Sequence, residues 1–191
     1  MELVFIRHGE GEHTLEIPSS LHIEDPSLTA KGIEQAKLLR NQLPLNNNDI
    51  IFISPIRRTL ETAYIWSENI DCRKIVSPLV SPRIFPIHPS CSTLPCDKIL
   101  DLEAILDFYP TFEIDHKAPR NIWTEGINTL PEKQFIKLAE EFIVNCKRLQ
   151  KEKIYIVSHD GTITSYRQMI SGQRLSRKDF LQETDWFQIT C

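Results

Sequence analysis

The chain has 191 residues, a formal net charge of −4, and 41% hydrophobic and 25% charged residues, an ordinary composition for a globular protein. This length favours a single domain, residues 1–191, with a substantial core. The acidic balance disfavours a non-specific nucleic-acid binder, and the lack of a run of about 18 apolar residues disfavours a membrane-spanning protein. Any anion site must therefore be built locally from a few clustered cations.

The N-terminus and the cysteines bear on the compartment. Met-Glu followed by four apolar residues lacks the basic start and the long apolar stretch of a secretory signal. The five cysteines are scattered, and Cys91 and Cys96 have no second pair at zinc-finger spacing. We therefore expect free thiols, no metal site and a cytoplasmic location.

Strand and helix patterns alternate along the chain. Short β-branched or aromatic segments predict strands at 2–7, 50–54, 74–76, 153–158 and 186–190, the last as a candidate edge strand. Helical spacing predicts helices from an N-cap at Thr29 to Leu43, and at 56–69 (with Leu60, Ala63 and Tyr64 inward), 97–108, 131–149 and 161–170. This alternation predicts an α/β fold, a three-layer α/β/α sandwich with a mainly parallel sheet.

Three strand ends carry side chains suited to an anion. Arg7-His8-Gly9 follows the first strand, and its glycine would let the backbone approach a ligand closely. Ser54 to Ala63 enters a helix whose first turn holds two arginines, Arg57 and Arg58, of which only one can easily face the site. Ser158-His159-Asp160-Gly161 follows the fourth strand. Because open α/β sheets bind ligands at such strand ends, the three segments predict one phosphate-compatible site.

These motifs resemble, in order along the chain, those of the histidine phosphatase superfamily, the phosphoglycerate-mutase-like proteins. The similar segments are Leu3 to Gly9, Asp25 to Thr29 with Gly32, Gln35 and Ala36, Ser54 to Ala63, and Ser158 to Gly161. The third of them selects Arg58 over Arg57. The resemblance implies a phosphoglycerate-mutase-like fold.

The resemblance also implies a mechanism. His8 would attack the phosphorus and form a phosphohistidine, while a backbone carbonyl holds the proton of its other ring nitrogen. Arg7, Arg58 and His159 would bind the phosphate oxygens and stabilise the charge that develops on them. No metal or other cofactor is expected, because these side chains supply the positive charge.

The general acid is not where phosphoglycerate mutases keep it. Their glutamate follows the third strand, whereas residues 80–86 of this chain hold no carboxylate. Three substitutes are considered: Asp160, placed as in the acid-phosphatase branch, Asp97, where the Pro-rich segment meets a helix, and Glu103. We favour Asp160 as the residue that protonates the leaving alkoxide.

Further contacts are expected around the phosphate. Thr14 can donate a hydrogen bond to it, His13 would line the pocket, and Arg83 would be another substrate or phosphate contact. The Pro-rich segment 77–96 predicts an irregular loop that serves as a lid, and 109–128 completes the rim.

The leading prediction is a metal-independent phosphatase that hydrolyses a small phosphomonoester through a phosphohistidine on His8. Two alternatives remain open: a phosphoglycerate-type phosphomutase, and a non-catalytic phosphate-binding or interaction module. The expected partner is a small phosphorylated metabolite, with no nucleic acid and no membrane. Neither the oligomeric state nor the particular substrate is predicted.

Overall fold

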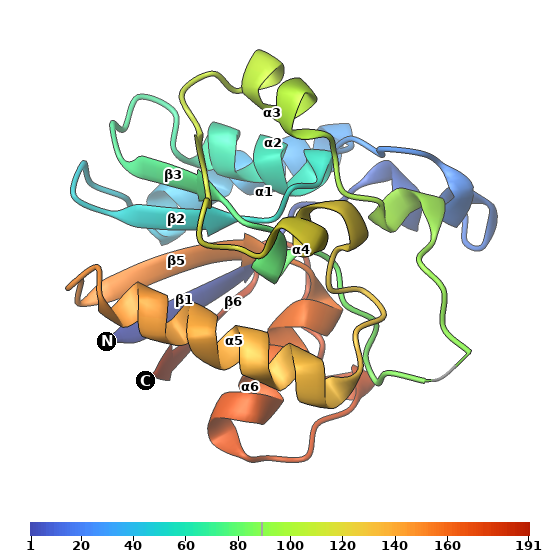
Figure 1. Cartoon of the computed structure of the whole chain (residues 1–191). Coiled ribbons are helices and arrows are strands. Elements are labelled where there is room, and N and C mark those ends of the chain that lie inside the picture. Colours follow the sequence, from blue (N-terminus) through green and yellow to red (C-terminus); the bar gives the residue numbers. More distant parts are fainter. Residues whose placement is uncertain (89) are drawn as a thin grey trace.

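A six-stranded sheet forms the centre of the computed structural model, which describes residues 1–88 and 90–191 (Figure 1). Pro89, within the predicted Pro-rich loop, lies outside the described residues. The strand order is β4-β3-β2-β5-β1-β6, with β6 antiparallel to β1 and the other pairs parallel. The strands are β1 Glu2–Arg7, β2 Ile50–Ile53, β3 Arg73–Val76, β4 Glu113–Ile114, β5 Lys153–Ser158 and β6 Trp186–Thr190.

Helices cover both faces of this sheet, which confirms the predicted α/β sandwich (Figure 1). α1, α2 and α3 pack on one face, while α5 and α6 pack on the other. None of the helices in the described ranges is long and apolar enough to cross a bilayer. The helices are α1 Ala30–Gln42, α2 Arg57–Trp66, α3 Leu102–Phe108, α4 Arg120–Glu125, α5 Glu132–Lys147 and α6 Asp160–Ser171.

The apolar run of β1 is explained by burial on both faces. Leu3 and Phe5 join the cluster under α5 and α6, whereas Val4 and Ile6 join the cluster under α1 and α2. All four side chains are fully buried, and burial of such a side chain contributes about 1.5–3 kcal/mol. A central parallel strand therefore reads as continuously apolar rather than alternating.

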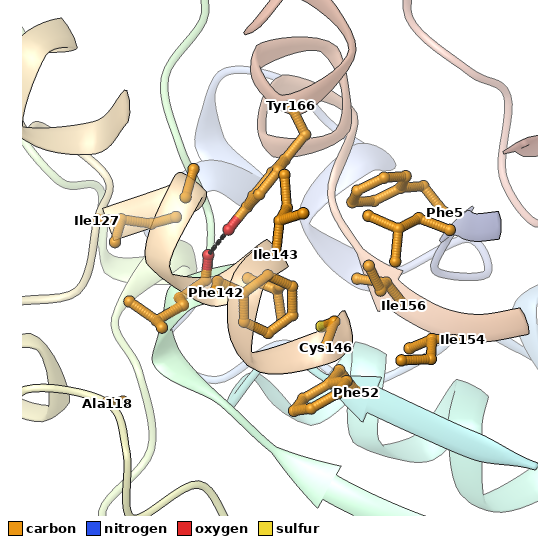
Figure 2. Close-up of a cluster of buried hydrophobic side chains, with 14 of the residues drawn as sticks. Phe5, Phe52, Ala118, Ile127, Phe142, Ile143, Cys146, Ile154, Ile156 and Tyr166 are labelled. Atoms are coloured by element: carbon orange, nitrogen blue, oxygen red, sulfur yellow. Dashed lines mark hydrogen bonds between the residues drawn. The ribbon is translucent and has the colours of Figure 1, made fainter. Parts of the chain in front are cut away.

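The cluster under α5 and α6 also holds the start of the Pro-rich segment in place. Phe5, Phe52, Phe142 and Tyr166 gather in it (Figure 2). The Tyr166 hydroxyl donates a hydrogen bond of 2.9 Å to the backbone oxygen of Leu79. This bond ties α6 to the chain that leaves β3 and enters the site.

Several local predictions are confirmed and others are wrong. Thr29 caps α1 by accepting a hydrogen bond from the Gly32 N–H at 3.0 Å, as expected, and β6 lies at the sheet edge. Tyr64 is 55% exposed, so its inward orientation was wrong. The predicted helix 97–108 is a short 3-10 turn, Pro95–Asp97, followed by α3, because the Asp101 side chain caps a new helix start. β4 and α4, inside the predicted rim, had not been expected.

Candidate active site

The carboxyl ends of three neighbouring strands bring the site together. β1, β2 and β5 are adjacent, and Arg7 lies opposite Ser158 in the β1–β5 register. The backbone N–H of Ser54, just beyond β2, donates to the oxygen of Val157 at 3.1 Å. Residues that are distant in sequence therefore converge at one edge of the sheet.

His8 lies just beyond β1 and is only 2% exposed. Its Nδ1 is 2.7 Å from the Gly9 backbone oxygen, so Nδ1–H donates to that carbonyl and the Nε2 lone pair faces the cavity. Burial, followed by the positive charge of Arg58, lowers the pKa of His8 well below its usual value. The ring is thus neutral at neutral pH, as a nucleophile must be.

Arg58, in the first turn of α2, links the two histidines. Its Nε donates to His8 Nε2 and its Nη2 to His159 Nδ1, each across 3.2 Å. The same guanidinium donates to the Cys96 oxygen at 2.7 Å and to Asp97 Oδ1 at 2.9 Å. Arg58 is 2% exposed, so this cation is held in one orientation by partners on every side.

Arg57, its neighbour, faces elsewhere. Arg57 Nε donates to Asp25 Oδ2 at 2.6 Å, and its guanidinium lies over the Phe108 ring of α3. It does not line the cavity described below. The structure therefore brings Arg58, and not Arg57, to the histidines.

His159 precedes α6 and takes the N-cap position. Its Nε2 is 2.8 Å from the Ser54 hydroxyl, and its ring centre is 5.1 Å from that of His8. Burial and the charge of Arg58 lower its pKa well below the ordinary value. Because Arg58 donates to Nδ1, the neutral ring carries its proton on Nε2, which donates to the Ser54 hydroxyl.

Arg7 is held by the C-terminal part of the chain. Its Nη1 donates to the Leu181 backbone oxygen at 2.6 Å, and its Nη2 is 3.1 Å from Glu183 and 3.4 Å from Asp160. Two carboxylates and one carbonyl thus fix a cation close to His8. We refer to Arg7, His8, Arg58 and His159 as the His–Arg cluster.

The His–Arg cluster lines a cavity of about 570 Å³. His13, Thr14, Asp97 and Asp160 line it as well. The pKa of His13 falls to about 3, mainly through burial and then through Arg58 and Arg7. The Thr14 hydroxyl donates to the Gly11 oxygen at 2.8 Å. A larger cavity of about 830 Å³ adjoins this one at Phe85, but it contains no member of the His–Arg cluster.

The two aspartates approach the cluster differently. Asp97 pairs tightly with Arg58 at 2.9 Å. Asp160 lies 3.4 Å from Arg7, and its Oδ1 accepts a hydrogen bond of 2.6 Å from the Gly161 N–H. Glu103 is exposed on α3 and does not line the cavity, so the structure does not bring it to the site.

Arg83 and Gly9 have contacts that the sequence did not suggest. Arg83 lines the cavity, and its guanidinium donates to the Ile127 and Leu130 oxygens and to Glu132 and stacks over the Phe135 ring. Gly9 packs closely against α1. A Cβ there would lie 2.6 Å from the Gly32 oxygen of α1.

Sequence reasoning missed two supporting residues. Ser54 was part of a recognised motif, but its contact with His159 depends on β2 and β5 being neighbours. Glu183 had no signal, because a lone glutamate in an irregular segment looks like any surface residue. Within residues 1–88 and 90–191, no group of three or more His, Cys, Asp and Glu side chains is arranged to hold a metal ion.

Comparison with known proteins agrees with this geometry. Residues 3–81 match the model of the histidine phosphatase superfamily, branch 1. Phosphoserine phosphatase 1 of Hydrogenobacter thermophilus is 36% identical over 63 residues, which are 33% of this chain and 29% of that protein. Adenosylcobalamin/alpha-ribazole phosphatase of Escherichia coli is 26% identical over 167 residues, 86% of this chain and 76% of that protein.

A solved structure shows the same fold. The ecdysone phosphate phosphatase of Bombix mori, in complex with tungstate, superposes with a TM-score of 0.68 at 12% identity, covering 100% of this chain and 89% of that chain. The two curated relatives are both named as phosphatases. Residues 3–81, which include Arg7, His8 and Arg58, are thus similar to the histidine phosphatase superfamily.

Proposed function

We propose that this chain hydrolyses a small phosphomonoester through a phosphohistidine formed on His8. The observation that carries the proposal is the Nδ1–H bond to the Gly9 carbonyl, which leaves Nε2 unprotonated and facing the cavity, as a nucleophile requires. Nε2 forms a bond to phosphorus as the ester P–O bond breaks, and the leaving oxygen takes a proton. Water then attacks the phosphohistidine and releases inorganic phosphate.

The charge of the transferring phosphoryl group is met by Arg7, Arg58 and His159. All three line the same cavity as His8, and both guanidinium groups are oriented by partners before substrate arrives. Such preorganised donors stabilise a transition state because they need little reorganisation. His159 Nδ1 accepts from Arg58 in the free protein. When a phosphate oxygen takes over Arg58 Nη2, the Ser54 hydroxyl can donate to His159 Nε2, and the ring proton on Nδ1 can then bind a phosphate oxygen. Thr14 and His13 remain candidates for further phosphate contacts.

Asp160 is the proposed proton donor. It lines the cavity, and its contact with Arg7 at 3.4 Å is looser than the 2.9 Å pair between Asp97 and Arg58. A carboxylate bound tightly to the phosphate-binding arginine is less available to carry a proton. Asp160 would first protonate the leaving alkoxide and then activate the water.

The proposal is tested by p-nitrophenyl phosphate hydrolysis with and without EDTA. We expect turnover that needs no metal, and a loss of kcat on the order of 10³-fold or more in His8→Ala, as removal of a covalent nucleophile typically causes. His116→Ala is the matched control, because His116 is exposed and does not line the cavity. Unchanged activity in His8→Ala would reject the nucleophile, and conversion of 3-phosphoglycerate to 2-phosphoglycerate would favour the mutase alternative.

The substrate is proposed only as a small phosphorylated metabolite. The relatives are named for phosphoserine, alpha-ribazole phosphate and ecdysone phosphate, which share little besides the ester. We also propose one domain over 1–191, a lid role for 77–96, and a cytoplasmic location. The last is supported by five free cysteines, three of them buried, which suit a reducing compartment.

A further inference from the structure

Asn128 lines the His–Arg cavity, and its buried side-chain amide has no hydrogen-bond partner among the described residues. The residue is 3% exposed, and neither its amide oxygen nor its amide nitrogen has a hydrogen-bond partner within the described part of the chain. It lines the cavity that holds His8 and Asp97. An unpaired buried amide lowers stability, so a ligand that supplied both partners would remove that cost.

The backbone around Asn128 is fixed, which limits the region that its side chain can occupy. Its own backbone oxygen accepts from the Ile84 N–H at 3.1 Å. The preceding residue, Ile127, donates through its N–H to the Ser81 hydroxyl at 3.3 Å and accepts from Arg83 Nη1 at 3.1 Å. Groups held in this way bind with little loss of conformational freedom.

Outside the His–Arg cluster and the two aspartates, much of the cavity lining is apolar. This apolar part includes Ile17, Leu21, Pro82, Ile84, Phe85 and Leu94. Beyond the His–Arg cluster, the cations of this wall are Arg83, which is engaged with Glu132, and the exposed Arg177. A pocket of this kind fits an apolar body that carries a single neutral polar group.

We propose that Asn128 is a specificity-determining residue, which binds an amide-like edge on an otherwise apolar alcohol portion of the phosphomonoester. The edge offers one hydrogen-bond donor and one acceptor, as in a carboxamide or a ring lactam, and pairs with both atoms of the Asn128 amide. This inference rests on the proposed phosphatase activity and specifies its substrate class. Small substrates with two further charged groups fit this wall less well.

The test compares phenyl phosphate with 2-, 3- and 4-carbamoylphenyl phosphate. We expect the wild-type protein to prefer at least one carbamoyl isomer by about tenfold in kcat/KM, mainly through KM, as one net pair of hydrogen bonds provides. Asn128→Leu should abolish that preference ratio. Asn121→Leu, on the exposed surface of α4, is the matched control and should keep it. No preference for any isomer, or a preference that survives Asn128→Leu, overturns the inference.

Two further readouts separate this inference from the proposed function. Asn128→Leu should raise Tm by about 2–4 °C, because an apolar side chain of similar size removes an unsatisfied amide. A merely structural asparagine would lose stability instead, and Asn128→Asp provides a second variant if the leucine does not fold. Calorimetric binding of the same probes to His8→Ala tests the preference without turnover. If the wild-type protein does not hydrolyse the probes but His8→Ala binds a carbamoyl isomer more tightly than phenyl phosphate, only the proposed activity is rejected. If the wild-type protein hydrolyses the probes but all of them bind His8→Ala with equal Kd values, only the inference about Asn128 is rejected.

Discussion

Arg58 Nε donates a hydrogen bond to His8 Nε2 across 3.2 Å, so the lone pair of the proposed nucleophile is occupied until a phosphate arrives. The arriving phosphoryl group must take over this donor, and the guanidinium then lies against its oxygens. The contact thus keeps the histidine neutral and aimed in the free protein, and supplies charge in the complex.

Arg58→Ala and Arg57→Ala form a matched pair of variants. Arg58→Ala should lower kcat/KM for p-nitrophenyl phosphate by about 10²–10³-fold, because a preorganised cation is lost from the transition state. Arg57→Ala should change it by less than about threefold, because that guanidinium pairs with Asp25 outside the cavity. Steady-state kinetics measure both effects, and equal losses would show that the choice of Arg58 over Arg57 as the cavity arginine is wrong.

The two cavity aspartates can be distinguished by leaving group. Asp160→Asn should slow hydrolysis of an alkyl phosphate by on the order of 10²-fold, and that of p-nitrophenyl phosphate far less, because nitrophenolate needs little protonation. Asp97→Asn makes the same chemical change on the carboxylate that pairs with Arg58. A plot of log kcat against leaving-group pKa should steepen only for Asp160→Asn. Steepening in Asp97→Asn alone would transfer the acid role to Asp97.

The buried histidines should make stability depend on acid. The pKa values of His8, His13 and His159 are lowered in the folded protein, that of His13 to about 3, mainly by burial. In the unfolded chain histidines titrate near 6.5, so below that pH the unfolded state binds more protons and stability falls as pH falls. The stability that comes from keeping these rings neutral is fully present above about pH 6.5. For His13 it is lost as the pH falls from about 6.5 to about 3.

Urea unfolding at several pH values measures this dependence. Each histidine should contribute about 1.4 kcal/mol per pH unit within its window. His13→Gln should reduce the slope by the equivalent of about one proton, whatever it does to stability at pH 7.5. A slope unchanged by His13→Gln would show that this ring is already protonated in the folded protein.

Gly32→Ala should destabilise the protein although it removes no contact. An added Cβ would lie 2.1 Å from the backbone oxygen of Glu10, so α1 and the chain after His8 would have to separate. Overpacking of this kind costs typically about 1–3 kcal/mol. Gly172→Ala, where nothing lies within 4 Å but φ is +67°, measures backbone strain alone. A smaller loss at Gly32 than at Gly172 would contradict the close-packing argument.

The central elements could be predicted because their signals are local. The apolar run of β1, the Thr29 cap and the periodicity of α5 depend on neighbours in sequence, and each appears within a residue or two of its predicted place. Tyr64 was misplaced because helical periodicity does not say how wide the buried face is. β4 has only two residues and was too short to give a pattern.

Three residues of the candidate site could be predicted because each lies in its own sequence motif. His8 and His159 directly follow strands, Arg58 lies in the first turn of the helix after β2, and parallel strands bring such ends together. The partners of Arg83 could not be predicted, because its charge is visible in the sequence while its contact with Glu132 depends on the fold. Asn128 gave no signal in the sequence, because only the structure shows that no described residue forms a hydrogen bond with its side-chain amide.

The bonds that hold Arg7 have a consequence for the order in which the site is assembled. Arg7 and its carbonyl partner Leu181 are 174 residues apart. A ribosome therefore makes Arg7 long before it makes the Leu181 carbonyl and Glu183 that orient it. The pairing of β1 with β5 can form in the nascent chain before the Arg7 guanidinium is fixed in place.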